Sequence, residues 1–376
     1  MFMQKKENKI TIKTIPRKDY REFYVTLNNL SSEGTFFQET LEKLEKKDIL
    51  VNKVVFFGNA EKIAKLLPEV RGKYPYLVIG NSLPDEVVSA YVSGIEISSG
   101  KSREVKMAGE IIGRYFDLPD FEYLNVPGIY LKNKQKVFEQ EAKGEYEKIA
   151  EVLKQYDFSA KNIYRFWNYM DEIWQNYSAF NEARNAYFAQ NKIAEFPAAT
   201  GIEAKLGFEK KISLGFEAIK PKEEKGFSWE TISFNLQAEP QKYDSQVSGL
   251  KSGPKFSRAV LADFPGSQAK KFYISGISSA NELGEASLAD NLPKNVAYVM
   301  HSFERLLEKG GFSLADLVST HVYSKNKEIS LEFEKLYATK NWQFPYNPVF
   351  TNICRESFLF EIEGIAADNS EDYSFE

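Results

Sequence analysis

The sequence has little of several residue types that define common classes of protein. Its single cysteine, Cys354, cannot form an internal disulfide, which fits a reducing compartment, and we expect a cytoplasmic protein. Only two histidines are present, His301 and His321, and neither has a metal-ligand spacing to the cysteine, so no zinc site is expected. No run approaches the ~18 apolar residues of a membrane helix. Residues 1–20 are charged throughout and lack the apolar segment of a secretory signal, so we expect no membrane partner.

Nucleotide-binding motifs are missing as well. The stretch 94–102, "GIEISSGKS", resembles a P-loop but has five residues between its glycines where four are required. No strand-Gly-x-Gly-x-x-Gly-helix unit is found, so a dinucleotide-binding fold has no support. The net charge of −4 does not indicate a nucleic-acid partner. A small anionic ligand stays open, because it needs only a local cluster of arginines.

What is present is the composition of an ordinary folded protein. The 376 residues are 43% hydrophobic, 14% aromatic and 27% charged. This length allows two domains, or one large one, with a substantial core. The oligomeric state cannot be read from the sequence, and a monomer is plausible.

The clearest positive feature is a sequence passage that occurs twice in the chain. Residues 196–219 and 344–366 both pass through Pro-x-x-Thr-x-Ile and both close on a hydrophobic run that contains Phe-Glu. Upstream of each passage the apolar spacing predicts a helix, a turn, a strand and a second helix. In this upstream part Leu153 and Leu307 are separated by 154 residues. Anchors in one order with small length differences indicate an internal duplication.

The spacing shortens toward the end of the repeat. Pro197 and Pro348 are separated by 151 residues, and Glu217 and Glu361 by 144. We therefore interpret Glu217 as the counterpart of Glu361 and expect the closing hairpin of the second copy to be shorter by seven residues.

Each copy is predicted as helix, strand, helix, strand and strand, which favours an α+β fold with helices on one face of a mixed sheet. The acidic tail has a composition typical of disorder. We expect an N-terminal region of uncertain fold (1–125), a first unit (126–220), an insertion (221–255), a second unit (256–366) and a disordered tail (367–376).

This order resembles the Rid (YjgF-like) family, whose subunits close on "EIE-x-IA", as in "EIEGIA" at Glu361–Ala366 here. Rid subunits form trimers with ligand sites in the clefts between them. The resemblance implies that the two copies build such a cleft within one chain. A pseudo-trimer would follow if the N-terminal region supplied a third wall.

Four passages are similar to those of the chorismatases, tandem Rid-like enzymes that hydrolyse chorismate. Together they span roughly Tyr164–Ala366, and the chain departs from the family between Tyr273 and Leu292, where a family histidine is missing. This departure leaves open an altered substrate or a loss of activity. The passages are "RFWNY" with "YSAFNEARNAYF" (165–169 and 177–188), "FPAATGIEA" (196–204), "PKFSRA" (254–259) and "ICRESFLFEIEG" (353–364).

Glu361 is the candidate catalytic residue. Strand alternation places Glu361 and Glu363 on one face and Phe360 and Ile362 on the other. The resemblance implies that Glu361, seven residues after Cys354, protonates the enolpyruvyl methylene of chorismate. A glutamate whose pKa is raised by burial can supply that proton.

The remaining candidates are substrate-binding residues. Two carboxylates need planar bidentate donors, and Arg184 and Arg258 lie inside the matching passages, ahead of Arg165 and Arg355. The resemblance implies that Cys354 and Ala259 shape the pocket and the product. Tyr169, Thr200 and Gly201 complete the expected set.

The function that follows is cleavage of chorismate to pyruvate and 3-hydroxybenzoate, or to pyruvate and a dihydroxycyclohexadiene carboxylate. The partner would be this small anionic substrate. Since the reaction transfers no electrons to an acceptor, no cofactor is expected. Two alternatives stay open: a Rid-type enamine or imine hydrolase, and a Rid-like protein that binds a small molecule without turnover.

Overall fold

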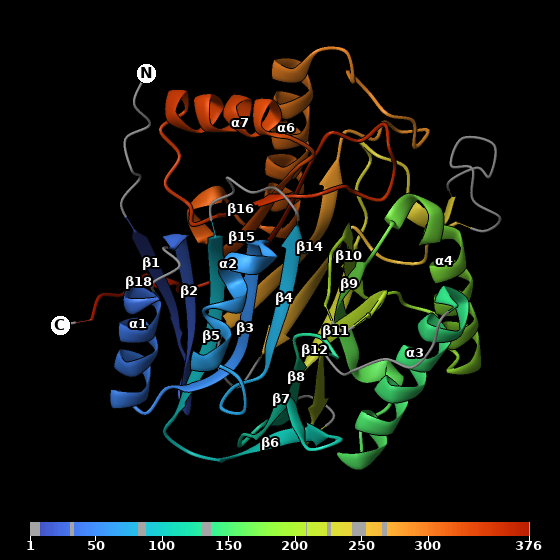
Figure 1. The fold of residues 1–376 in the computed structure, drawn as a ribbon. Helices are drawn as coiled ribbons and strands as arrows, with labels where there is room; N and C mark the ends of the chain where they lie inside the picture. The colour runs from blue at the N-terminus through green and yellow to red at the C-terminus, as the bar shows by residue number, and fades with distance from the viewer. Residues whose placement is uncertain are drawn as a thin grey trace.

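The computed structural model describes residues 8–30, 34–81, 88–129, 137–207, 209–223, 227–242, 253–264 and 269–375. Three six-stranded mixed sheets face a common centre, and the main helices lie outside them (Figure 1). In the described part of the chain, no helix combines the length and the apolar character needed to cross a bilayer.

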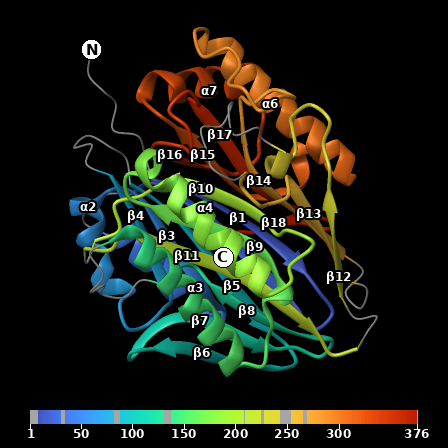
Figure 2. The same cartoon turned by 90° about the vertical axis from the view of Figure 1, so that its right-hand side faces the viewer.

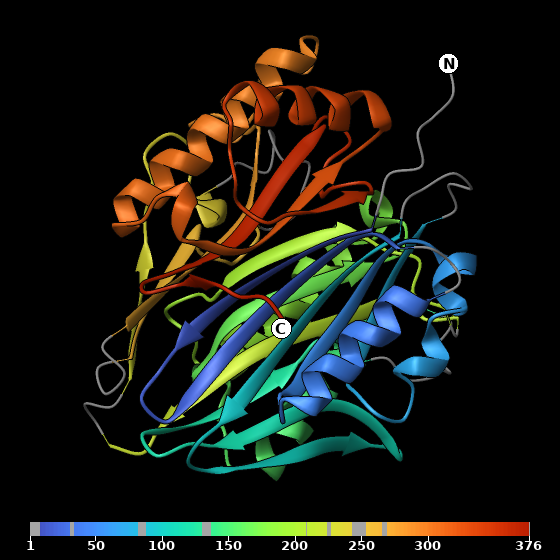
Figure 3. The same ribbon diagram turned by 90° about the vertical axis from the view of Figure 1, so that its left-hand side faces the viewer.

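The first sheet is built from the N-terminal quarter of the chain and the C-terminal tail. Its strand order is β18-β1-β2-β5-β3-β4, and α1 and α2 cover its outer face (Figure 3). The elements are β1 (Lys9–Pro16), β2 (Tyr20–Leu30), α1 (Thr35–Lys46), β3 (Leu50–Asn59), α2 (Ala60–Ala64), β4 (Tyr76–Asn81), β5 (Val88–Ile97) and β18 (Glu371–Asp372).

The second sheet has the order β10-β9-β11-β8-β7-β6, and α3 and α4 lie together on its outer face (Figure 2). Its elements are β6 (Lys101–Met107), β7 (Glu110–Asp117), β8 (Phe121–Val126), α3 (Phe138–Gln155), β9 (Ile163–Met170), α4 (Ile173–Gln190), β10 (Ala198–Glu203) and β11 (Ile212–Pro221).

The third sheet has the order β12-β13-β14-β17-β15-β16, with α6 and α7 outside it. Its elements are β12 (Ser228–Ile232), β13 (Ala259–Phe264), β14 (Ala269–Ser278), α6 (Leu292–Gly310), β15 (Leu317–Ser324), α7 (Lys327–Thr339), β16 (Asn347–Phe350) and β17 (Phe360–Ala367).

The same unit therefore occurs three times. The strand orders of the three sheets are equivalent: β1-β2-β5-β3-β4, β7-β8-β11-β9-β10 and β13-β14-β17-β15-β16. Along the chain, the third strand of each unit (β3, β9 or β15) has a helix before it and a helix after it. In the pairings of β3 with β5, β9 with β11 and β15 with β17, the register shifts at the equivalent place. The shift comes immediately before Lys53, Arg165 and Ser319. The N-terminal region, for which we predicted no fold, is thus a third copy, and these three residues occupy equivalent positions.

The ends of the units differ from the boundaries that we expected. Strands β6–β8 join the second sheet because β8 pairs with β11, so that unit starts before residue 126. The expected insertion contributes β12, which pairs with β13. The tail is ordered through residue 375: Lys13 pairs with Asp372, and the Tyr373 ring lies edge-on to Phe23 at 5.3 Å. Its two aromatic side chains offset the acidity from which we inferred disorder.

Local sequence explains why the helices begin and end where they do. The side chain of Asn291 accepts a hydrogen bond from the backbone N–H of Lys294 at the start of α6, and Pro293 stands in its first turn. The helix ends at Gly311, whose φ of 84° is left-handed. Its buried face, which includes Val299 and Phe303, packs on the third sheet.

The spacing of 154 residues holds for the first half of the repeat, since β9 begins at Ile163 and β15 at Leu317. The predicted register of the closing strand was wrong. Ser213 pairs with Tyr169 as Glu361 pairs with Tyr323, so Ser213 is the counterpart of Glu361. Most of the length difference lies in the second helix, because α4 has 18 residues and α7 has 13.

Four apolar clusters hold the units together. Three lie between each sheet and its own helices. The fourth is central and draws residues from all three sheets, including Tyr91, Tyr164 and Tyr273. Each sheet is thus covered on both faces, which explains why its strands have few exposed positions.

Candidate functional site

A pocket lies where the second sheet meets the third. About 540 Å³ of space, partly open to solvent, is enclosed there. The wall from the second sheet comes from β9, β10 and α4, and the wall from the third comes from β14, β17 and the segment before β17. The lining residues are Asn168, Tyr177, Phe180, Arg184, Ala199, Thr200, Gly201, Pro254, Phe256, Arg258, Gly276, Ser278, Cys354, Arg355, Phe358 and Glu361.

Glu361 lines this pocket from β17 and is 4% exposed. Burial is the main cause that raises the pKa of its carboxyl to about 8, and the negative charge of Glu363 adds to the effect. The cations Arg258 and Arg165 act in the opposite direction. Among the described residues, no hydrogen bond to this carboxyl is found. At neutral pH Glu361 is therefore mainly a carboxylic acid with a proton to donate.

Gly276 makes room for that carboxyl. A Cβ atom at Gly276 would lie 2.1 Å from Oε1 of Glu361. The pairing of β14 with β17 shifts between Ile274 and Ile277, which is a β-bulge beside the pocket. Ser275 anchors this bulge through its hydroxyl. The hydroxyl accepts a hydrogen bond from the Ala199 N–H at 2.8 Å and donates one to the backbone carbonyl of Ser257, just before β13. We missed Gly276 in the sequence, although a glycine inside a strand pattern is a known signal of a bulge or a close approach.

Three arginines line the pocket: Arg184 from α4, Arg258 just before β13 and Arg355 just before β17. The guanidinium of Arg184 lies 4.9 Å from the centre of the Phe180 ring, and its Nε has no hydrogen-bond partner among the described residues. Arg258 donates to the carbonyl of residue 238 at 2.8 Å, and Arg355 donates to that of residue 284 at 2.5 Å. Their guanidinium groups bring positive charge to the lining of the pocket.

Arg165 does not line this pocket. It forms a buried ion pair with Glu363, and Thr200 donates a hydrogen bond to the same carboxylate. The carboxylate also accepts from the Trp167 indole at 3.2 Å and from the Tyr323 hydroxyl at 2.7 Å. Burial acts to raise the pKa of Glu363, but Arg165 and the other donors outweigh it and leave this pKa lowered. Arg165 therefore neutralises Glu363, and it is not available as a substrate clamp.

The other predicted site residues divide between the pocket and the core. Thr200, Gly201 and Cys354 line the pocket. Tyr169 faces a second, smaller cavity together with Arg165. Ala259 is fully buried in the core between the third sheet and its helices and does not reach the pocket.

Neither Cys354 nor His321 is prepared for catalysis. Burial and the nearby Glu361 raise the pKa of the Cys354 thiol to about 12, so it is not a thiolate nucleophile at neutral pH. Burial lowers the pKa of His321 to about 4, and the imidazole is neutral beside the smaller cavity.

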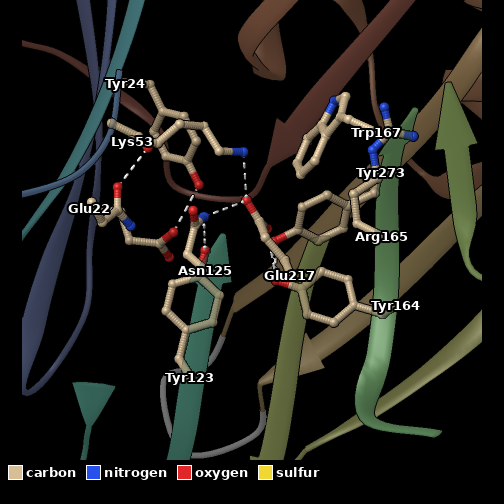
Figure 4. Close-up of polar contacts among 12 residues, drawn as sticks. Glu22, Tyr24, Lys53, Tyr123, Asn125, Tyr164, Arg165, Trp167, Glu217 and Tyr273 are labelled. Atoms are coloured by element: carbon tan, nitrogen blue, oxygen red, sulfur yellow. Dashed lines mark hydrogen bonds and ion pairs between the residues drawn. The ribbon is translucent and has the colours of Figure 1, made fainter. Parts of the chain in front are cut away.

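A second buried polar cluster occupies the centre of the molecule. Figure 4 shows Glu217 among Lys53, Asn125 and Tyr164, whose donor atoms lie 3.2, 2.9 and 2.9 Å from its carboxylate. None of these side chains lines the pocket. The cluster is a buried network that joins the first and second sheets, away from the pocket.

Comparison with known proteins identifies the fold. Residues 122–212 match the family model described as "Chorismatase FkbO/Hyg5-like, N-terminal". A chorismatase crystal structure superposes with a TM-score of 0.64 at 16% identity, covering 84% of this chain and 93% of that one. The resemblance to the chorismatase family is confirmed. The predicted α+β class with tandem Rid-like units is confirmed too, with three units in place of two.

Smaller structures are similar over about a third of this chain. Yeast Mmf1 has 16% identity and a TM-score of 0.30, with 37% of this chain and 98% of that one covered. The Rid-family protein YyfA of Yersinia pestis has 23% identity and a TM-score of 0.29 over the same shares. No curated protein matches the chain by sequence.

Proposed function

We propose that this chain cleaves the enolpyruvyl ether of chorismate in the pocket between its second and third sheets. The observation that carries the proposal is Glu361, a buried carboxylic acid whose pocket is lined by Arg184, Arg258 and Arg355. Chorismate carries two carboxylates and an acid-sensitive vinyl ether, so it requires both features. The family match and the chorismatase fold support the same substrate.

In the first step Glu361 donates its proton to the terminal methylene carbon. The carbon bonded to the ether oxygen becomes an oxocarbenium ion, and Glu361 becomes a carboxylate. Water that attacks this carbon gives a hemiketal, which collapses to pyruvate as its bond to the ring oxygen breaks. Glu361 then regains a proton from the attacking water. This route consumes one water and leaves the dihydroxycyclohexadiene carboxylate.

Attack by the C4 hydroxyl instead returns its proton to Glu361 and gives a cyclic ketal across C3 and C4. The C4–O bond then breaks, the C4 oxygen leaves in pyruvate, the C3 oxygen takes up a proton, and the ring loses its C3 hydrogen as a proton. The products are 3-hydroxybenzoate and pyruvate, with no net consumption of water. We propose this product first, because Cys354 lines the pocket close enough to Glu361 for the carboxyl to raise the pKa of the thiol. A thiol in this wall is a weak hydrogen-bond partner for an attacking water, which favours an intramolecular nucleophile. Ala259 takes no part, since it is buried in the core.

The arginines have the complementary task of holding the two carboxylates. Bidentate guanidinium–carboxylate pairs fix the direction of a ligand as well as its position. The positive charge that develops on the oxocarbenium carbon is balanced by the carboxylate that Glu361 becomes. No redox partner enters any step.

The experiment is incubation of the full chain with chorismate, with pyruvate release followed and the ring product identified. Replacing the proton donor, Glu361→Gln, should lower kcat by at least about 100-fold. Unchanged turnover would remove Glu361 from the mechanism. Activity on amino-acid-derived imines without activity on chorismate would select an imine hydrolase. Saturable binding of aromatic acids without product would select a non-catalytic binder.

A further inference from the structure

Ser278 is a pocket residue that the mechanism above does not use. It is the last residue of β14, and its backbone carbonyl accepts a hydrogen bond of 2.6 Å from the Gln237 amide, which holds the end of the strand. The residue is 5% exposed and lines the pocket. In the described part of the chain no partner for its hydroxyl is found. Because Ser278 lines the pocket, a ligand or a water in the pocket can take up the hydrogen bonds of this hydroxyl.

The strand register places this hydroxyl next to the proton donor. Ser278 lies directly opposite Glu361 in the antiparallel pair of β14 and β17. Residues opposite one another share a face of the sheet, with Cβ atoms about 5 Å apart. Beside them, the Glu361 carboxyl reaches over Gly276, two residues before Ser278. The two side chains can therefore contact two neighbouring groups of one ligand.

Chorismate has two groups at this separation. The methylene that receives the proton is attached through the ether oxygen to ring carbon C3, and the neighbouring ring carbon, C4, carries a hydroxyl. An arginine cannot accept a hydrogen bond from a hydroxyl, whereas the serine hydroxyl can both accept and donate. Among the described pocket residues, Thr200 has its hydroxyl directed to Glu363.

We propose that Ser278 is a substrate-positioning residue that hydrogen-bonds to the ring C4 hydroxyl while Glu361 faces the methylene. The inference rests on the proposed function and deepens it by assigning the group that orients the ring. A serine at this place recognises a vicinal hydroxy ether, and it discriminates against a ring acid that lacks the hydroxyl.

The test measures binding without turnover. In the Glu361→Gln background, calorimetry gives the Kd of chorismate and of its 4-deoxy analogue for the parent and for Ser278→Ala. We expect Ser278→Ala to weaken chorismate about 10-fold and to leave the deoxy analogue unchanged, as expected for the loss of one hydrogen bond. A purely structural serine would weaken both ligands equally, and that result would overturn the proposal.

Ser279→Ala is the matched control. Ser279 is the next residue, is completely buried and does not line the pocket. It should change neither Kd by more than about twofold. An equal loss from both serines would count against a specific contact of Ser278.

Turnover by the wild-type chain separates this inference from the proposed function. If the wild type releases no pyruvate but the binding difference is found, the proposed reaction fails and the hydroxyl contact stands. If pyruvate is released and Ser278→Ala binds both ligands as the parent does, the reaction stands and the Ser278 contact fails. If chorismate does not bind at all, both are wrong.

Discussion

The three interfaces between sheets are built from equivalent positions, yet they differ in chemistry. In the ladders of the parallel strand pairs, Leu77, Thr200 and Asn347 lie opposite Val55, Trp167 and His321, which are equivalent residues of the three units. Two positions further along the same strands, Ser89, Ser213 and Glu361 lie opposite Phe57, Tyr169 and Tyr323. Only one of the three interfaces therefore carries a carboxylic acid at this position.

The other two interfaces are filled by their own side chains. Between the third and first sheets, Asn347 donates to the carbonyl of Ala90 at 3.1 Å, and the Ser89 hydroxyl donates to that of Pro348 at 3.4 Å. Between the first and second sheets, a Cβ atom at Gly128 would lie within 3 Å of both Leu77 and Ser213. The pocket proposed as the site thus lies at one interface, and the other two interfaces are packed by their own side chains.

Each interface also contains one buried ion pair between sheets. Lys53 and Glu217 join the first and second sheets, and Arg165 and Glu363 join the second and third. The third interface uses Lys271 and Glu22, whose charged atoms lie 2.8 Å apart. These pairs join the sheets, whereas Glu361 has no such partner among the described residues, and burial raises its pKa so that it keeps its proton.

The largest expected effect is a difference in stability between the Glu217→Gln and Glu361→Gln variants. Glu217→Gln leaves the Lys53 ammonium buried without a counter-charge, and we expect the free energy of unfolding to fall by about 3–5 kcal/mol. Denaturant unfolding measures this loss. Glu361→Gln removes a neutral acid that has no ion pair, so its free energy of unfolding should change by less than about 1 kcal/mol.

For catalytic activity we expect the opposite: Glu361→Gln should lower kcat far more than Glu217→Gln does. Folded Glu217→Gln should keep kcat within about threefold of the wild type, because Glu217 does not line the pocket. A loss of kcat in Glu217→Gln comparable to that in Glu361→Gln would show that the two carboxyls act as one unit, and the comparison would fail.

A second prediction concerns the space around the acid. Gly276→Ala forces the Glu361 carboxyl away from its position, and we expect kcat to fall by about 10²-fold, as for a misplacement of about 1 Å. Gly201→Ala is the control on the same pocket, since the nearest atoms to its Cβ would lie 3.9 Å away. Steady-state kinetics of both variants decides the point: equal losses would mean that added bulk in the pocket, rather than displacement of Glu361, limits the reaction.

The sequence could predict several residues of this site from both of its walls. Glu361, Cys354 and the arginines at 184, 258 and 355 lie in the pocket, as the matching passages implied. Arg165 could not be assigned correctly, because the sequence does not reveal which buried carboxylate a guanidinium will meet. Its partner, Glu363, lies on a strand 198 residues away.

The register error has a related cause. Side chains alternate with a period of two, so Glu217 stays on the central face of its strand whether it is aligned with Glu361 or with Ile365. Only the strand pairing seen in the structure distinguishes these alignments. Glu217 pairs with Arg165, and Ile365 pairs with the equivalent residue Ser319, so Glu217 is the counterpart of Ile365. The N-terminal copy was missed because its topology needs only alternating apolar residues, and it shares none of the motifs by which we aligned the other two.

A third prediction is a shift in pH dependence. The acid form of Glu361 is present below its pKa of about 8, so kcat/KM should decline as pH rises through that value. Glu363→Gln removes the neighbouring negative charge and leaves Arg165 uncompensated, and both changes lower the pKa of Glu361. The alkaline limb of the profile should therefore move to lower pH.

The control for this shift is Glu203→Gln, a change of the same charge on β10, where the carboxylate accepts from Asn352 at 3.0 Å and does not line the pocket. Its profile should keep the wild-type limb. Profiles are compared on protein that thermal unfolding shows to be folded at each pH. A limb that stays in place in Glu363→Gln would show that burial alone keeps Glu361 protonated.

The smallest expected effect is a loss of stability on shortening the edge of the first sheet, whose unit does not line the pocket. Deleting residues 371–376 removes the pairing of β18 with β1 and the contact of Tyr373 with Phe23. The burial lost with this aromatic contact amounts to about 1–2 kcal/mol, and denaturant unfolding should show a fall of that size. Because the tail reaches no residue of the pocket, kcat and KM for chorismate should stay at the wild-type values. A change in either constant would mean that the first sheet supports the site through the central core, and that the three units cannot be divided into one that reacts and two that only pack.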